Sequence, residues 1–182
     1  MGFFSRLFSR KSVAPVVPAA PVKKPDTKVV SHSVAGTNYR QEAILAMGKK
    51  NPDYTLNKRE LLKRWPKGVT VDEYTFQPQK AELIPEPDNP HDPKAIKVLV
   101  DGVHVGYIKA GSCAHIHRLL RENRILKIKP TITGGKYKNV YSLNANPESS
   151  VDFELEKCSS PFYVRLEITE LLAAEVEKQK ND

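Results

Sequence analysis

The chain has 182 residues, of which 40% are hydrophobic and 27% charged, which is enough for one domain with a buried core. Its two cysteines, Cys113 and Cys158, have no metal-binding spacing, so we expect neither a zinc module nor a disulfide framework but a reducing, cytoplasmic setting. No apolar stretch approaches the roughly 18 residues of a membrane-spanning helix, and the N-terminus lacks the features of a secretory signal.

The net charge of +8 is unevenly distributed. Residues 40–67 contain eight basic and three acidic side chains, and residues 108–140 contain eight and one. Residues 68–107, between them, contain three basic and seven acidic side chains. Two basic segments of this kind could form a face that follows a phosphate backbone, although solvated faces of ordinary strands and helices would have the same composition.

Residues 1–28 are predicted to be a disordered tail that precedes a folded domain at residues 29–182. Residues 1–11 place four apolar side chains at helical spacing beside basic ones, as in a short peptide that docks on a membrane surface or a protein partner. An unstructured start without a role is the alternative. Residues 12–28 are rich in Ala, Pro, Val and Lys, which is typical of a semi-extended linker.

A first strand is expected from Val29, and two short helices follow it. Asn38 and Gln41 have the spacing of a capping box, which predicts a helix from Tyr39 to Met47 that ends at Gly48.

The second helix has a stronger start signal. Asn57 and Glu60 form a capping-box pattern, and Leu56 and Leu61 are spaced as a hydrophobic staple. The helix is therefore expected to run from about Lys58 to Trp65 and to stop at Pro66, with Trp65 in the core.

Strands are predicted next, at residues 69–76 and 80–85. The clearest element of the chain is a β-hairpin over residues 95–108, because Asp101-Gly102 is a strong two-residue turn signal between β-branched runs.

The last third of the chain is predicted to continue with a helix, three strands and a final helix. Ser112 is the expected N-cap of a helix that runs to Arg121, with Cys113 packed on its apolar side and Asn123 as C-cap. Two strands, 125–133 and 137–141, are expected around a turn at Gly134-Gly135. A loop at 144–151, a strand at 162–169 and a charged helix at 171–180 complete the chain.

Six or more short strands, joined mostly by hairpins and accompanied by two or three helices, predict an α+β, mostly β fold. Because there is no βαβ periodicity, a small antiparallel β-barrel with the helices packed at one end is expected.

Residues 86–95, here called the polar turn, connect two of these strands. Four prolines at or beside the segment stiffen the backbone, and four polar side chains lie between them: Asp88, Asn89, His91 and Asp92. A loop so stiff and so polar is suited to holding a ligand. Because Asp, Asn and Pro also dominate ordinary turns, a purely structural role is the alternative.

The polar turn, Glu86-Pro-Asp-Asn-Pro-His-Asp-Pro-Lys-Ala-Ile-Lys-Val, is followed by Val105-Gly-Tyr-Ile-Lys and then a helix. This pattern resembles the HIRAN domain family, over about residues 29–169. The resemblance implies a small OB-like barrel that recognises the 3′-hydroxyl end of single-stranded DNA, of the kind that occurs alone in bacteria and phages.

The resemblance also implies which residues would contact nucleic acid. Tyr39 would stack on the terminal base, and Asp92 would accept a hydrogen bond from the terminal sugar hydroxyl. His91 stands where the family has an aromatic platform. The full set of expected contacts is Asn38, Tyr39, Arg40, Asn89, His91, Asp92, Tyr107 and Lys109.

Physical chemistry supports such a site independently. A carboxylate such as Asp92 accepts a hydrogen bond from a free hydroxyl and repels a phosphate in the same place. Tyr39 and His91 could sandwich a base between them. Upstream phosphates would be held by Lys109, Arg118, Lys127 and Lys129.

Other function classes are disfavoured. His91, Asp92, His115 and His117 match no metal-binding spacing, no phosphate-binding glycine loop is present, and nothing indicates nucleophilic catalysis. We therefore expect a non-enzymatic DNA-binding module without metal, cofactor or small-molecule substrate. The alternative is a protein-interaction adaptor whose first 11 residues dock on a membrane or partner.

Overall fold

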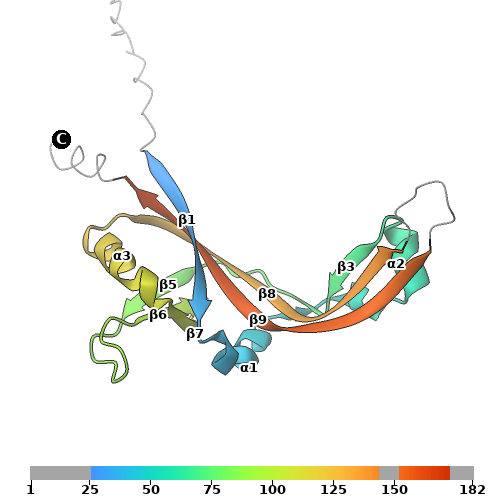
Figure 1. The fold of residues 1–182 in the computed structure, drawn as a ribbon, viewed down its shortest axis with the longest axis horizontal. Helices are drawn as coiled ribbons and strands as arrows, with labels where there is room; N and C mark the ends of the chain where they lie inside the picture. The colour runs from blue at the N-terminus through green and yellow to red at the C-terminus, as the bar shows by residue number, and fades with distance from the viewer. Residues whose placement is uncertain (1–25, 144–151, 173–182) are drawn as a thin grey trace, which may run out of the picture.

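The computed structural model describes residues 26–143 and 152–172. In this part of the chain the fold is mostly β, with a seven-stranded antiparallel sheet in the order β3-β8-β9-β1-β7-β6-β5 and a two-stranded sheet β2-β4 (Figure 1). The prediction of an α+β, mostly β, OB-like antiparallel fold with two or three helices is confirmed. The expectation that the helices pack at one end is wrong, because α2 (Lys58–Arg64) and α3 (Ala110–Arg121) lie at opposite ends of the sheet (Figure 1).

The strands are β1 Thr27–Ala35, β2 Lys49–Lys50, β3 Val69–Asp72, β4 Tyr74–Thr75, β5 Ala81–Pro85, β6 Ile96–Val100, β7 Val103–Ile108, β8 Ile125–Ser142 and β9 Phe153–Leu171. The α-helices are α1 Gln41–Ala46, α2 Lys58–Arg64 and α3 Ala110–Arg121, and two 3-10 helices are η1 Thr37–Arg40 and η2 Pro52–Thr55.

The two longest strands, β8 and β9, form one ribbon that crosses the whole molecule (Figure 1). At one end it joins β1, β5, β6, β7 and α3, and at the other it joins β3 and α2. The predicted turn at Gly134-Gly135 is wrong, and so is the expectation that the last strand begins at residue 162. The two glycines have φ of 104° and 91° and shift the register of a continuous strand. A Cβ at Gly134 would lie 2.1 Å from the carbonyl oxygen of Pro161, so the close approach of the two backbones requires glycine there.

The main core lies between the sheet and α3. β9 alternates strictly at this end, and its inward side chains, Phe162, Val164, Leu166 and Ile168, are all buried. Full burial of such a side chain stabilises the fold by about 1.5–3 kcal/mol relative to exposure. Cys113 on α3 is buried in the same cluster, which confirms its predicted packing role.

A second, smaller cluster anchors α2 to the far end of the ribbon. Leu61, Val71 and Val140 are buried there, with Trp65 half-buried against them rather than in the main core. The Lys138 ammonium donates to the carbonyl oxygen of Leu56 at 3.0 Å, which ties this end of the ribbon to the segment before α2.

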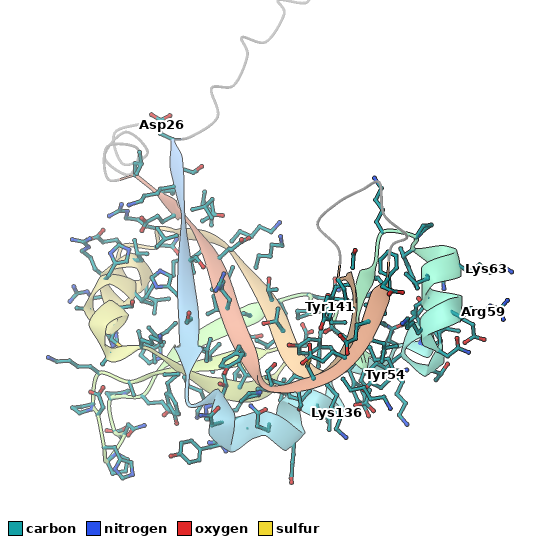
Figure 2. The ribbon with its side chains drawn as sticks, turned by 45° about the vertical axis from the view of Figure 1, so that its right-hand side comes forward. Asp26, Tyr54, Arg59, Lys63, Lys136 and Tyr141 are labelled. Carbon is teal, nitrogen blue, oxygen red and sulfur yellow. The ribbon has the colours of Figure 1, made fainter. Side chains whose placement is uncertain are left out.

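The capping box of α2 is confirmed. Asn57 Oδ1 accepts a hydrogen bond from the backbone N–H of Glu60 at 3.0 Å, and Glu60 Oε2 accepts one from the backbone N–H of Asn57 at 2.8 Å. On the outer side of this helix, Arg59 and Lys63 project away from the sheet (Figure 2).

The predicted capping box at Asn38 and Gln41 is wrong. No side chain caps η1 or α1, and α1 begins at Gln41 itself. The Gln41 amide instead binds the backbone of Phe162 on β9, accepting from its N–H at 2.7 Å and donating to its oxygen at 3.1 Å. The Gln41 side chain, which the local pattern assigned to a capping box, thus forms a tertiary hydrogen bond to β9 instead.

The hairpin turn at Asp101-Gly102 is confirmed, with φ of 48° and 83° at the two residues. By contrast, α3 begins at Ala110, with Lys109 as N-cap, so Ser112 is not its cap. Asn123 follows the C-cap Glu122 and has the left-handed φ of 51° that commonly ends a helix.

Three predictions lie wholly or largely outside the described residues: the docking peptide at 1–11 with the linker after it, the loop at 144–151, and the terminal helix. Leu171, where that helix was expected to begin, is the last residue of β9.

Candidate nucleic-acid interface

Asn89 organises the polar turn from within. Its Oδ1 accepts hydrogen bonds from the backbone N–H groups of His91 at 3.0 Å and Asp92 at 3.3 Å. Its Nδ2 donates to Glu86 Oε2 at 3.0 Å. Asn89 is therefore a half-buried structural residue whose bonds fix the direction in which His91 and Asp92 leave the backbone.

Asp92 combines a structural position with a place in a pocket. One carboxylate oxygen, Oδ1, accepts from the Lys94 N–H at 2.8 Å, and the Asp92 carbonyl oxygen accepts from the Ala95 N–H at 2.9 Å. The same side chain lines a pocket of about 280 Å³ together with Tyr107 and Ala110. A carboxylate has about four lone-pair sites, so the turn leaves capacity for a ligand.

A larger pocket of about 600 Å³ lies beside the first, lined by residues 85–91 and Tyr107. Both pockets share Asn89, His91 and Tyr107. The larger volume is within the range of small-ligand sites. Three of the predicted contact residues therefore stand at the junction of two neighbouring depressions.

Tyr107 owes its position to the sheet. On its two sides it is paired with Ala35 of β1 and Lys97 of β6. Directly paired residues share a face of a sheet, so these three side chains point to the same side. The row places the end of β1, and the turn η1 that follows it, next to the pocket.

The Glu86 carboxylate links Lys97, which pairs with Tyr107, to Asn89 of the polar turn. Glu86 was not among the contact residues expected from the sequence. It forms an ion pair with Lys97 and accepts from Asn89. Hydrogen bonds from Lys97, then Asn89, and last from Tyr107 lower the pKa of Glu86, and the bond to Glu86 raises the pKa of Lys97. The pairing of residue 84 with residue 97 in the β5–β6 hairpin brings Glu86 within reach of Lys97, and no local sequence pattern indicates this register.

Arg40 reaches the same region from η1. His104 packs its ring edge-on against Tyr107, with ring centroids 5.0 Å apart, and its Nε2 lies 3.1 Å from the Gly106 carbonyl oxygen. Burial lowers the pKa of His104, and the nearby Arg40 charge lowers it further. The Arg40 charge therefore acts on the ring that packs against Tyr107.

Tyr39 is the most exposed large side chain near this site, with 87% of its surface accessible. It lines a depression of about 350 Å³ made by residues 38–43, and Asn38 also borders one of about 490 Å³ with Ser159, Ser160 and Pro161 of β9. Tyr39 and His91 do not line a common pocket. The expectation that they sandwich one base between them is therefore not supported by this geometry.

The side chains predicted to bind phosphate, Lys109, Arg118, Lys127 and Lys129, are all exposed, but two of them already have neighbours within the chain. Lys109 is the N-cap residue of α3, beside the smaller pocket wall formed by Ile108 and Ala110. Arg118 lies 3.2 Å from His115 Nδ1, and Lys129 lies 3.6 Å from a Glu167 carboxylate oxygen.

Stability is expected to fall as the pH drops through about 6.5, because two half-buried histidines resist protonation. Burial is the largest cause that lowers the pKa of His32 below 6.5, followed by the charge of His115, and Glu170 opposes them. A lowered folded-state pKa means that the unfolded chain binds more protons below pH 6.5, so acid favours unfolding. Urea unfolding measures the free energy of unfolding at about pH 5 and about pH 7.5. The loss of this free energy between the two pH values should be smaller for His32→Gln than for the unchanged chain. An equal difference would exclude His32 as a source of the acid sensitivity.

Residues 26–143 and 152–172 contain neither a cluster suited to a metal ion nor a membrane-spanning helix. No group of three or more His, Cys, Asp or Glu side chains is placed to hold a metal ion there. No helix within those ranges is long and apolar enough to cross a membrane.

Searches of curated proteins and of solved structures give no match. A family model, the HIRAN domain, matches residues 29–153, which include η1 with Tyr39, the polar turn and Tyr107. The match covers well over half of the chain, and the chain belongs to the HIRAN domain family.

Proposed function

We propose that this chain binds the 3′-hydroxyl end of single-stranded DNA at the polar turn, and that it does so without catalysing a reaction. HIRAN domains are in general modules that bind DNA, single-stranded DNA in particular. The observation that carries the proposal is that Asp92, Asn89, His91 and Tyr107 surround one pocket.

A 3′ end differs from the interior of a strand in having a free hydroxyl and no next phosphate. Asp92 supplies both halves of that distinction, because a carboxylate accepts from the hydroxyl and repels a phosphate group. Its bond to the Lys94 N–H holds the carboxylate in place before the ligand arrives. An acceptor that is already oriented costs little further ordering on binding.

The remaining residues have complementary roles. Tyr39, exposed at the surface, offers a face on which a base can stack without regard to its sequence. Arg40 and Lys109 would bind the phosphates nearest the end, so affinity should fall as salt rises. His91 is an exposed ring at the mouth of both pockets and would contact the terminal sugar or base.

Asp92→Asn is the sharpest test, because the amide oxygen can still accept from the Lys94 N–H while the negative charge is lost. We expect the preference for a 3′-hydroxyl over a 3′-phosphate oligonucleotide to fall by about tenfold, mainly through tighter binding of the phosphate. Fluorescence anisotropy with the two oligonucleotides measures the preference, and thermal unfolding checks that the fold is retained.

Asp92→Ala serves as the comparison. It removes both the charge and the turn bond, so it should lose the preference and also lower the melting temperature. Were Asp92→Asn to keep the full preference, Asp92 would be a turn residue only, and its role in end recognition would be wrong.

The proposal fits processes in which free 3′ ends are exposed, namely DNA repair and replication, in a bacterial or phage setting. Both cysteines are free thiols, which fits a reducing, cytoplasmic environment.

A further inference from the structure

The outward face of β9 carries an aromatic ring and a guanidinium that the end-binding site does not use. Side chains of β9 alternate here, with Phe162 and Val164 buried and Pro161, Tyr163 and Arg165 exposed. Tyr163 has 53% of its surface accessible. An exposed tyrosine on a sheet face, two residues from an exposed arginine, offers a stacking surface and a phosphate contact on the same side.

The neighbours of these two side chains are small and polar. Tyr163 is paired with Thr133 of β8, and Arg165 is paired with Thr131 of β8 and Ser33 of β1. Such short side chains cannot cover the ring or the guanidinium from the side. Within the described residues Arg165 has no acidic partner, whereas the next outward residue, Glu167, lies close to Lys129.

This face is continuous with the end-binding site through β1. Ser33 and Ala35 point to the same side of β1 because they are two residues apart. Ser33 is the partner of Arg165, and Ala35 is the partner of Tyr107. On β1, the side chains that separate Arg165 from the Tyr107 pocket are therefore the small ones of Ser33 and Ala35.

A second connection runs through η1 and α1. The Gln41 side chain is bonded to the backbone of Phe162, the residue before Tyr163. The depression of about 490 Å³ lined by Asn38, Gln41 and residues 159–161 joins the Tyr39 turn to this end of β9. The two exposed tyrosines, 39 and 163, thus belong to neighbouring parts of one surface.

We propose that Tyr163 and Arg165 form a second contact site, which binds nucleotides of the same strand upstream of its 3′ end. Tyr163 stacks on a base, and Arg165 binds a backbone phosphate. The inference rests on the proposed function, since it extends the strand that the polar turn holds. A flexible single strand suits the site because its bases are free to stack, whereas those of a duplex are already paired.

Oligonucleotide length separates this site from the first one. Competition anisotropy would compare 3′-hydroxyl oligonucleotides of about 2 and about 12 nucleotides on the full chain, because Tyr163 and Arg165 lie two strands from Tyr107, about 10 Å away, beyond a dinucleotide held in the pocket. Tyr163→Ala and Arg165→Gln should each weaken binding of the longer oligonucleotide by about 5- to 10-fold and leave the shorter one within about twofold. The length dependence arises because only the longer strand reaches the second site.

Matched controls lie at the far end of the ribbon. Tyr141 is exposed near the end of β8, and Arg59 projects from α2 (Figure 2). Tyr141→Ala and Arg59→Gln remove the same groups from the chain at positions away from the proposed path. Neither should change the affinity for either oligonucleotide by more than about twofold.

The outcomes distinguish the two proposals. If Tyr163→Ala and Arg165→Gln bind the longer oligonucleotide as the controls do, the second site is wrong, even where the unchanged chain prefers a 3′-hydroxyl. If the unchanged chain shows no such preference, the end-binding role is wrong, but a loss confined to the longer oligonucleotide still supports the second site. Equal losses for both lengths would overturn it.

Discussion

Replacement of Tyr39 by alanine is expected to weaken binding of a single-stranded oligonucleotide by about tenfold or more. Base–aromatic stacking contributes about 1–3 kcal/mol per base, and each 1.4 kcal/mol is a factor of ten in affinity. The melting temperature should hardly change, because the ring is 87% exposed and supports no core contact. Anisotropy titration and thermal unfolding of the same preparation give both values.

Tyr39→Phe is the matched control, since it keeps the ring and removes only the hydroxyl. It should bind within about threefold of the unchanged chain. If Tyr39→Ala binds equally well, the turn after β1 takes no part in the interface, and the stacking surface must be sought elsewhere.

Gly106→Ala is expected to destabilise the fold by about 3–5 kcal/mol, because strained backbone and a steric clash add together. Gly106 has φ of 146°, and a Cβ there would lie 2.2 Å from the Ala35 carbonyl oxygen and 2.7 Å from a Val34 methyl carbon. Because Tyr107 follows directly, the strain would also separate β1 from β7 at the site. Urea unfolding measures the free energy.

Gly111→Ala provides the comparison for this effect. Gly111 lies in α3, and a Cβ there would meet nothing within 4 Å. Alanine is favoured over glycine in a helix, so this variant should be unchanged or more stable by up to about 1 kcal/mol. If Gly106→Ala is as stable as Gly111→Ala, the close approach of β1 and β7 at Gly106 is not as described.

Short sequence patterns correctly predicted those elements that are fixed by hydrogen bonds between residues close together in the chain. The capping box of α2 and the Asp101-Gly102 turn involve residues within three positions of each other, and both are found as expected. The helix after β1 is present but begins at Gln41 rather than Tyr39, without the predicted capping box, and the Gln41 side chain bonds to Phe162, 121 positions away. A sequence pattern holds no information about such a partner.

The glycine pair in β8 shows a second limit. Gly134-Gly135 has the composition of a turn, yet β9 continues past it and keeps the ribbon extended. Whether two glycines reverse a strand or bend it depends on the partner strand. That pairing was not predicted because the alternation of Phe153-Glu-Leu-Glu is broken at Lys157, and residues 157–161 are mostly polar.

The candidate site was predictable in its composition but not in its arrangement. The polar turn was identified from its own residues. Glu86, which binds Lys97 and Asn89, was missed because its partners come from two different segments. Tyr163 and Arg165 were missed because their position relative to Tyr107 depends on the pairing of β1 with both β7 and β9.

The central claim is that the polar turn holds a free 3′ end, and the affinity of the unchanged chain for two matched oligonucleotides tests it most directly. One oligonucleotide ends in a 3′-hydroxyl and the other in a 3′-phosphate, with sequence, length and salt held equal. We expect the hydroxyl end to bind at least about tenfold more tightly, because Asp92 accepts from the hydroxyl and repels the phosphate. Equal, weak and salt-sensitive binding of both oligonucleotides would contradict the claim.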